Sequence, residues 1–180
     1  LCEQHGTFYV LDACQSAGQV PLDVGTLKCD VLSGTGRKYL RGPRGTGFLY
    51  AGPRALERIE PPFLDLHAAE WTGARTYEIR ADARRFENWE TYYAGKLGLG
   101  AAVDYALELG VEATSERIVA LGSSLRSALD ALGGVTSHDK GECRGGIVTF
   151  EVDGIATEDV QALLSAQQIS TSTSPVGHAR

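Results

Sequence analysis

Two residues near the start of the chain could together perform chemistry on a bound cofactor. Lys38 lies in a Gly-, Ser- and Thr-rich segment at 33–39, although the chain has only four lysines among 17 basic residues. Asp12 and Gln15 follow an apolar, β-rich run at 7–11. A lysine amine can form a Schiff base, and a carboxylate can keep a pyridine nitrogen protonated. Their pairing therefore predicts a pyridoxal 5'-phosphate (PLP) site.

The position of Asp12 at the end of a predicted strand favours a ligand site. The carboxyl ends of parallel strands open into the crevice where α/β proteins bind small molecules. We expect the Asp12 carboxylate to face the amine of Lys38 across such a crevice, on the order of 10 Å apart. Gln15 is near enough in sequence to donate to the ring oxygen of the cofactor. For Asp12 taken alone, an ordinary strand end with an Asx turn is the more common explanation.

The segment before Lys38 has the groups that bind a phosphate. Ser33 and Thr35 carry hydroxyls and Arg37 carries a guanidinium, and these groups bind phosphate oxygens together with backbone N–H groups. The segment matches neither nucleotide pattern, GxxxxGK[ST] or GxGxxG, because Tyr39 follows the lysine and the glycines are differently spaced. A Gly-rich surface loop is the alternative, and the conjunction with Asp12 argues against it.

The composition is that of a globular protein, with 43% apolar and 22% charged residues among 180. A net charge of -6 argues against a nucleic-acid or membrane-surface partner. The four cysteines show no CxxC spacing, so we expect reduced thiols in a cytosolic protein, and no metal site is predicted. No methionine occurs, even at position 1, which suggests a piece of a longer protein; a processed mature chain is the alternative.

The pattern of apolar residues predicts an α/β fold. The predicted strands are residues 7–11, 29–32, 47–50, 75–81 and 147–152, with a further strand at Val135. The predicted helices are residues 92–109, 115–132 and 158–167, with Ser115 and Thr157 as N-caps of the last two. The second helix has a leucine-rich stripe that includes Leu121 and Leu125. The alternation of helix and strand after residue 110 predicts a separate α/β unit at 111–180.

Two segments of this chain resemble the class V aminotransferases, a group that includes cysteine desulfurases, selenocysteine lyases, isopenicillin N epimerases and kynureninases. Residues 11–18 are LDACQSAG and residues 33–50 are SGTGRKYLRGPRGTGFLY. They are similar to the family pattern D-A-x-Q-x-x-G, then S-x-[ST]-x-H-K, then G-P-x-G-x-G-x-L-Y. Weaker similarity at 85–87 and 145–148 extends the resemblance over nearly the whole chain.

The resemblance implies a type I PLP-dependent transferase fold and a homodimer with sites at the subunit interface. Residues 1–110 would be the C-terminal part of the large PLP-binding domain, and residues 111–180 the N-terminal part of the small domain. By matching position, Lys38 would form the Schiff base with PLP. Asp12 would contact the ring nitrogen and Gln15 the ring oxygen. Thr35, supported by Ser33, would hold the phosphate.

The departures from the family pattern bear on the reaction. Arg37 stands where desulfurases usually have His, and one extra residue separates Lys38 from the following Gly-Pro pair. Residues 88–91, Asn-Trp-Glu-Thr, replace the Gly-Thr pair with which desulfurases reach the neighbouring subunit's phosphate. The stretch 169–178, which corresponds to the loop of the desulfurase nucleophile, has no cysteine. Cys143 lies elsewhere, and we expect it to be a buried small residue.

These features predict a PLP-dependent enzyme that acts on an amino acid through a Schiff base at Lys38. The Arg37 variant and the missing cysteine favour an epimerase-like or C–S-lyase-like member of the class. A class V aminotransferase or a cysteine desulfurase is the first alternative. A non-catalytic fragment or binding domain is the second, and the joint presence of Asp12, Gln15, Thr35 and Lys38 argues against it.

Overall fold

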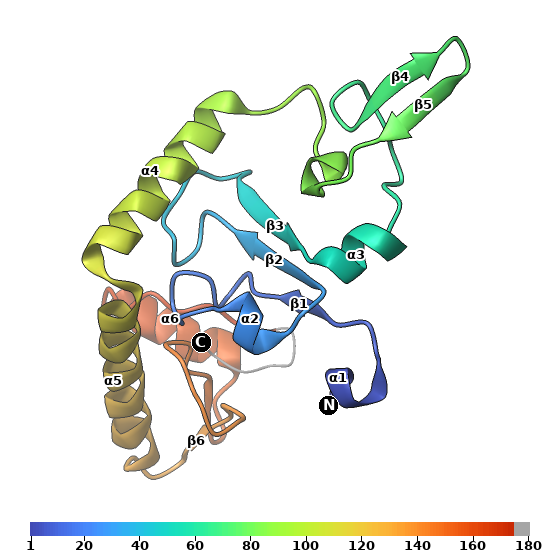
Figure 1. Ribbon diagram of the computed structural model, residues 1–180. Coiled ribbons are helices and arrows are strands. Elements are labelled where there is room, and N and C mark those ends of the chain that lie inside the picture. The colour runs from blue at the N-terminus through green and yellow to red at the C-terminus, as the bar shows by residue number, and fades with distance from the viewer. Residues whose placement is uncertain (175–180) are drawn as a thin grey trace. The chain divides into compact units, whose positions relative to one another are not determined.

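The computed structural model of this chain describes residues 1–174. It consists of two compact units, Leu1–Val111 and Glu112–Arg180 (Figure 1). Gly110, with a φ of 89°, ends the last helix of the first unit. No helix within the described residues is both long and apolar enough to span a membrane.

The first unit contains a three-stranded sheet, a separate hairpin and one long helix. Its elements are α1 (Cys2–His5), β1 (Val10–Asp12), α2 (Val24–Leu27), β2 (Val31–Thr35), β3 (Gly47–Ala51), α3 (Pro53–Arg58), β4 (Ala69–Gly73), β5 (Thr76–Ile79), the 3₁₀ helix η1 (Ala83–Phe86) and α4 (Tyr93–Leu109). The second unit follows with α5 (Val111–Asp130), β6 (Val135–Ser137), β7 (Phe150–Val152) and α6 (Thr157–Ala166).

The sheet is mixed, with β2 between the other two strands (Figure 1). β1 runs parallel to β2, so that Asp12 is paired with Ser33, and β3 runs antiparallel to β2, so that Thr35 is paired with Gly47. The predicted second strand, 29–32, differs from β2, which begins two residues later and ends three residues later because it continues through Gly34 to Thr35. A side chain at position 34 would collide with the ring of Phe48, so this position in the strand requires glycine.

Strand alternation separates the core from the candidate site. Leu11, Leu32 and Tyr50 lie on one face of the sheet and pack with the buried residues Ala13 and Cys29. Burial of a side chain such as Leu32 stabilises the fold by about 1.5–3 kcal/mol. Successive side chains of a strand point to opposite faces, and paired residues share a face. The register therefore places the side chains of Asp12, Ser33 and Thr35 together on the face opposite this core.

A second core cluster fixes the segment that follows Lys38. Ala17, Leu40 and Ala106 are buried against one another, with Leu99 and Val103 packed beside them. Three of these residues come from one side of α4, which thereby packs on the loop that carries the lysine. The small alanines allow the close approach. The lysine loop is thus held by core packing as well as by its own turn.

The helix starts in the second unit differ from the prediction. α5 begins at Val111, so Ser115 lies one turn inside it and is not an N-cap. Thr157 is the first residue of α6, and Ala156 precedes it as the cap. The leucine stripe is not the buried side of α5: Leu121 is 52% exposed, whereas Gly122 and Arg126 are buried.

A buried ion pair stabilises the second unit. Arg126 Nε donates to Asp139 Oδ2 at 2.6 Å, and both side chains are less than one tenth exposed. The same guanidinium donates to the carbonyls of Gly145 (2.7 Å) and Ile147 (2.8 Å). Asp139 Oδ1 accepts the backbone N–H of Thr149 at 2.8 Å. α5 and the two ends of the β6–β7 connection are therefore joined by charge-assisted hydrogen bonds.

Candidate functional site

Asp12 ends β1 with an Asx turn and stays exposed. Its Oδ1 accepts the backbone N–H of Cys14 at 2.9 Å, and the Ala13 N–H continues the strand pairing by donating to the Ser33 carbonyl at 2.8 Å. The thiol and the backbone N–H of Cys14, together with the positive charge of Lys38, lower the pKa of Asp12. The carboxylate is therefore ionised at neutral pH and can accept a further hydrogen bond.

Lys38 is positioned by a closed loop between β2 and β3. The Gly36 N–H donates to the Thr46 carbonyl at 2.8 Å, and the Gly42 N–H returns to the Gly36 carbonyl at 2.7 Å. Within this loop the Lys38 carbonyl accepts the N–H of Arg41 at 2.9 Å. Lys38 is half-buried, and its charge acts on the Asp12 carboxylate. The loop therefore holds Lys38 near enough for its charge to stabilise the ionised Asp12 carboxylate.

Gly18, the glycine of the D-A-x-Q-x-x-G pattern, allows the turn after β1 to contact the lysine loop. Its φ is 83°, a conformation that L side chains rarely adopt. A Cβ at this position would lie 2.8 Å from the backbone N of Leu40 and 2.8 Å from the carbonyl carbon of Tyr39. Only glycine thus permits backbone contact next to Lys38.

We expect Gly18→Ala to destabilise the protein and to displace the lysine loop. The matched control is Gly45→Ala: Gly45 has a φ of 78°, but nothing lies within 4 Å of its added Cβ. The control should lose about 1–2 kcal/mol from backbone strain alone. Gly18→Ala should lose about 1–3 kcal/mol more because of the collision. Urea unfolding measures both, and equal losses would contradict the close packing.

The other predicted site residues differ in how closely the structure places them to Asp12 and Lys38. Ser33 and Thr35 share the face of Asp12, and Thr35 Oγ1 lies 3.5 Å from the Thr46 carbonyl, a long contact that leaves the hydroxyl able to turn to another acceptor. Gln15 and Arg37 are exposed. Among residues 1–174, no hydrogen bond or ion pair joins either side chain to Asp12 or Lys38.

Cys14 belongs to the site and was not among the predicted residues. Its thiol is half-buried beside Asp12, and its Sγ lies 4.0 Å from the Ser33 carbonyl. Donation to Asp12, partial burial and the negative charge of Asp12 raise the pKa of this thiol. The sequence held one signal for it: the Asx turn expected at Asp12 places the second following residue against the carboxylate.

Arg85, within η1, has a structural role. Arg85 Nε donates to the Arg80 carbonyl at 2.6 Å and its Nη1 to the Leu56 carbonyl at 2.9 Å. Asn88 and Thr91, which replace the expected Gly-Thr pair, line a cavity of about 540 Å³ beside β3. This cavity is lined by apolar as well as charged side chains and has no residue in common with the predicted cofactor site.

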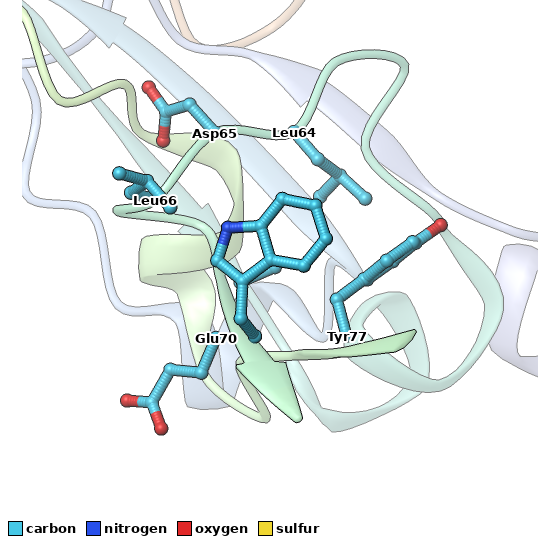
Figure 2. A pocket seen from close by; sticks show the side chains of 7 residues that line it. Leu64, Asp65, Leu66, Glu70 and Tyr77 are labelled. Atoms are coloured by element: carbon cyan, nitrogen blue, oxygen red, sulfur yellow. The ribbon is translucent and has the colours of Figure 1, made fainter. Parts of the chain in front are cut away.

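A more apolar pocket of about 390 Å³ lies at the β4–β5 hairpin. Figure 2 shows Leu64, Leu66 and Tyr77 around it, with the carboxylates of Asp65 and Glu70 at its edge. The strand β4, with the residues AEWTG, was not among the predicted strands. The pocket contains no lysine and no predicted site residue, so it is not the place of the proposed chemistry.

The expectation that Cys143 is buried is wrong. The structure exposes this thiol in the connection between β6 and β7. The reason is the buried Arg126, which bonds the carbonyls of Gly145 and Ile147 and leaves the residues before them at the surface. Of the stretch 169–178, the last four residues lie outside the described part of the chain.

Comparison with known proteins identifies the family. The family model described as aminotransferase class-V matches residues 1–179. The chain belongs to the class V aminotransferase family. Its relatives include a "Probable cysteine desulfurase" of Halalkalibacterium halodurans, 29% identical over 94% of this chain. A "Probable cysteine desulfurase 2" of Mycobacterium leprae is 34% identical over 96% of it. The chain spans about 41% of the length of these two relatives.

Two solved structures have the same fold as this class V family member. The apo cysteine desulfurase of Thermococcus onnurineus has a TM-score of 0.81 at 27% identity, over 95% of this chain and 43% of that one. The cystine C-S lyase C-DES, in complex with cysteine persulfide, has a TM-score of 0.81 at 27% identity, over 92% and 44%. The fold is therefore part of a type I PLP-dependent transferase, as predicted, and the α/β class is confirmed.

Proposed function

We propose that the full-length protein is a PLP-dependent enzyme that acts on an amino acid at Lys38. The observation that carries the proposal is that the Asp12 carboxylate ends β1 beside Ser33 of β2, with the charge of Lys38, from the loop that follows β2, acting on it. The chemistry of the donor set fits PLP: a carboxylate for the ring nitrogen, an amine for the aldehyde, and the hydroxyls of Ser33 and Thr35 for the phosphate. A C-DES structure with glycine covalently linked to its PLP cofactor, at 28% identity and a TM-score of 0.78, supports the assignment.

Bound PLP would supply an electron-withdrawing ring that stabilises negative charge at the substrate Cα. The Asp12 carboxylate would hold a proton on the ring nitrogen, and its lowered pKa suits this role because the group stays charged at neutral pH. The Lys38 amine, once released by substrate, would take the proton from the substrate Cα as a general base. Ser33 and Thr35 would fix the phosphate, and Gln15 would orient the ring through its oxygen.

Among the class V reactions we propose cleavage of a C–S bond, with the sulfur leaving in a small product. The names of the relatives and of the C-S lyase neighbour support C–S chemistry over epimerisation. A persulfide held on the protein needs a thiolate on a loop near the substrate sulfur. Residues 169–178, the corresponding stretch, offer hydroxyls and no thiol. A cysteine desulfurase is the second candidate, which the relatives' names favour directly.

Product analysis separates the candidates. The full-length protein with PLP is supplied with L-cysteine or L-cystine. A lyase releases pyruvate, ammonia and a free sulfur product. A desulfurase releases alanine and leaves sulfur on the protein, an aminotransferase yields a sulfur-containing keto acid, and an epimerase yields the D-amino acid. We expect pyruvate; alanine as the main product would overturn the preference, and no turnover of any amino acid would contradict the function itself.

We expect Cys143→Ser to retain activity and to change the melting temperature little, because the exposed thiol makes no contact on which the fold depends. The measurement is the rate of pyruvate formation, with circular dichroism as the test of folding. Because Cys143 is exposed on a connecting loop, a persulfide mechanism could use it. Complete inactivation of a folded, PLP-binding variant would therefore return desulfurase chemistry to first place.

A homodimer and a cytosolic location belong to the same proposal. Exposed aromatic side chains of the first unit, Phe63 (82% exposed), Trp71 (66%) and Tyr93 (67%), offer apolar surface to a second copy. The four cysteines are free thiols, which fits a reducing compartment.

A further inference from the structure

A cavity of about 540 Å³ in the second unit contains the exposed thiol of Cys143. α5 and the β6–β7 connection supply the other lining residues, among them Ser123, Arg126, Asp130, Glu142 and Arg144. A cavity of this size accommodates a small organic ligand. The thiol therefore lies beside a space that a ligand can enter, and that space belongs to one unit alone.

Arg126 gives this cavity a buried hydrogen-bond donor. Its side chain is 6% exposed, its Nε is bonded to Asp139, and its Nη2 donates to two backbone carbonyls. Within the described part of the chain, its Nη1 has no hydrogen-bond partner. Buried polar groups almost always have one, and a carboxylate is an acceptor that a guanidinium binds strongly. The unsatisfied Nη1 of a cavity-lining arginine therefore points to a ligand with a carboxylate group.

The exposed lining residues carry charges of both signs. Arg144 adds a second guanidinium, whereas Glu142 and Asp130 add carboxylates. Among residues 1–174, no hydrogen bond or ion pair engages the side chain of Glu142 or Arg144. Asp130 accepts the Ser137 hydroxyl at 2.7 Å through Oδ1 alone. The guanidinium groups suit a carboxylate and the two acids suit an ammonium group, so the lining matches a zwitterionic amino acid.

We propose that the cavity binds one half of an amino-acid disulfide such as L-cystine and that Cys143 then exchanges with it. The thiol loses its proton to water, and the thiolate attacks one sulfur of the bound disulfide. A new S–S bond forms to Cys143, the S–S bond of the ligand breaks, and the other half leaves as a thiolate. Cys143 is thereby oxidised and the released half is reduced. The inference does not rest on the proposed PLP chemistry.

The rates of exchange at Cys143 with L-cystine and with hydroxyethyl disulfide test the proposal. The protein is the full-length chain with Lys38→Ala, in which the proposed reaction cannot consume cystine, and mass spectrometry of the Cys143 peptide gives each rate. Hydroxyethyl disulfide carries no charge, so the ratio of the two rates cancels the reactivity of the thiol itself and reports recognition of the zwitterion.

Arg144→Gln and Glu142→Gln should each lower the ratio of the cystine rate to the hydroxyethyl disulfide rate by about threefold or more, because each variant loses one charged contact to the amino acid. A ratio that is unchanged in either variant would overturn the proposal. So would a Cys143 that does not react with cystine.

Arg117→Gln is the matched control. Arg117 is an exposed residue of α5 that does not line the cavity. The substitution removes the same charge from the same unit, so the ratio of the two rates should stay at the parent value. An equal fall in this control would show a general effect of charge and would overturn the site.

Thermal unfolding tests the part that Arg126 plays. Arg126 is not itself replaced, because its loss would leave Asp139 charged and buried. The adduct formed with cystine should melt about 2 °C or more above the hydroxyethyl adduct, since the carboxylate of the bound half satisfies Nη1. The difference should disappear in Cys143→Ser, in which the other thiols still react. Equal melting temperatures of the two adducts would contradict a carboxylate on Arg126.

Discussion

In Lys38→Ala, the full-length protein should lose the absorption band that covalently held PLP gives at the edge of the visible range. Turnover should fall on the order of 10³-fold, because the variant lacks both the amine that holds the cofactor and the general base. The loop itself should fold, because its closure depends on backbone bonds from Gly36 and Gly42 and not on the lysine side chain. Absorbance and a rate assay measure the two effects.

Lys28→Ala is the matched control for this prediction. Lys28 is in the same unit and pairs with Glu3 at 2.7 Å at the surface, where both side chains are more than half exposed. An exposed pair of this kind contributes little to stability. The control should keep the band and the rate. A Lys38→Ala protein that keeps the band would show that another amine holds the cofactor.

In Asp139→Ala, the second unit should lose about 3–5 kcal/mol of stability. The substitution leaves the guanidinium of Arg126 charged and almost fully buried, which is a severe penalty. Removal of one charged partner destabilises a buried pair more than removal of both. Arg126→Leu combined with Asp139→Ala should therefore recover part of the lost stability. Circular dichroism during urea unfolding reports the change. A loss below about 1 kcal/mol would contradict the burial of this pair.

Asp82→Ala supplies the control, since Asp82 bonds Arg84 at the same 2.6 Å but both side chains are at least half exposed. It should change stability far less than Asp139→Ala.

Acid should destabilise the second unit, because protonation of Asp139 removes the same ion pair as the Asp139→Ala substitution. Burial raises the pKa of Asp139, but its bonds to Arg126 and Thr149 outweigh burial and lower it. The stabilisation is therefore present above the unfolded-state pKa of about 3.9 and is lost as the pH falls through the folded-state value.

The sequence predicted the α/β class and the two segments that carry Asp12 and Lys38, because both depend on short local patterns. An apolar run before Asp12 indicates the end of a strand, and the Gly-rich segment that holds Lys38 indicates a loop; the structure has Asp12 at the end of β1 and Lys38 in the loop after β2. The extent of β2 was not predictable in this way. Gly34 suggests a turn by itself, and only the ring of Phe48, fourteen residues later, makes a glycine suitable within the strand.

The start of α5 and the surroundings of Cys14 were likewise not predictable from short local patterns. Ser115 has the side chain of an N-cap, but Gly110 ends α4 and the next helix begins at once, so the serine lies inside. Burial of Arg126 depends on its contact with Asp139, which no helical periodicity reveals. The thiol of Cys14 comes within 4.0 Å of the Ser33 carbonyl because β1 pairs with β2, a contact between segments distant in the sequence.

Borohydride reduction of the PLP-loaded full-length protein, followed by peptide mapping, tests the central claim most directly. Reduction fixes the cofactor on the lysine that holds it. This chain offers Lys28, Lys38, Lys96 and Lys140 as acceptors. We predict a single phosphopyridoxyl label, on Lys38. A label on any other lysine, or no label on a protein that binds PLP, would contradict the account.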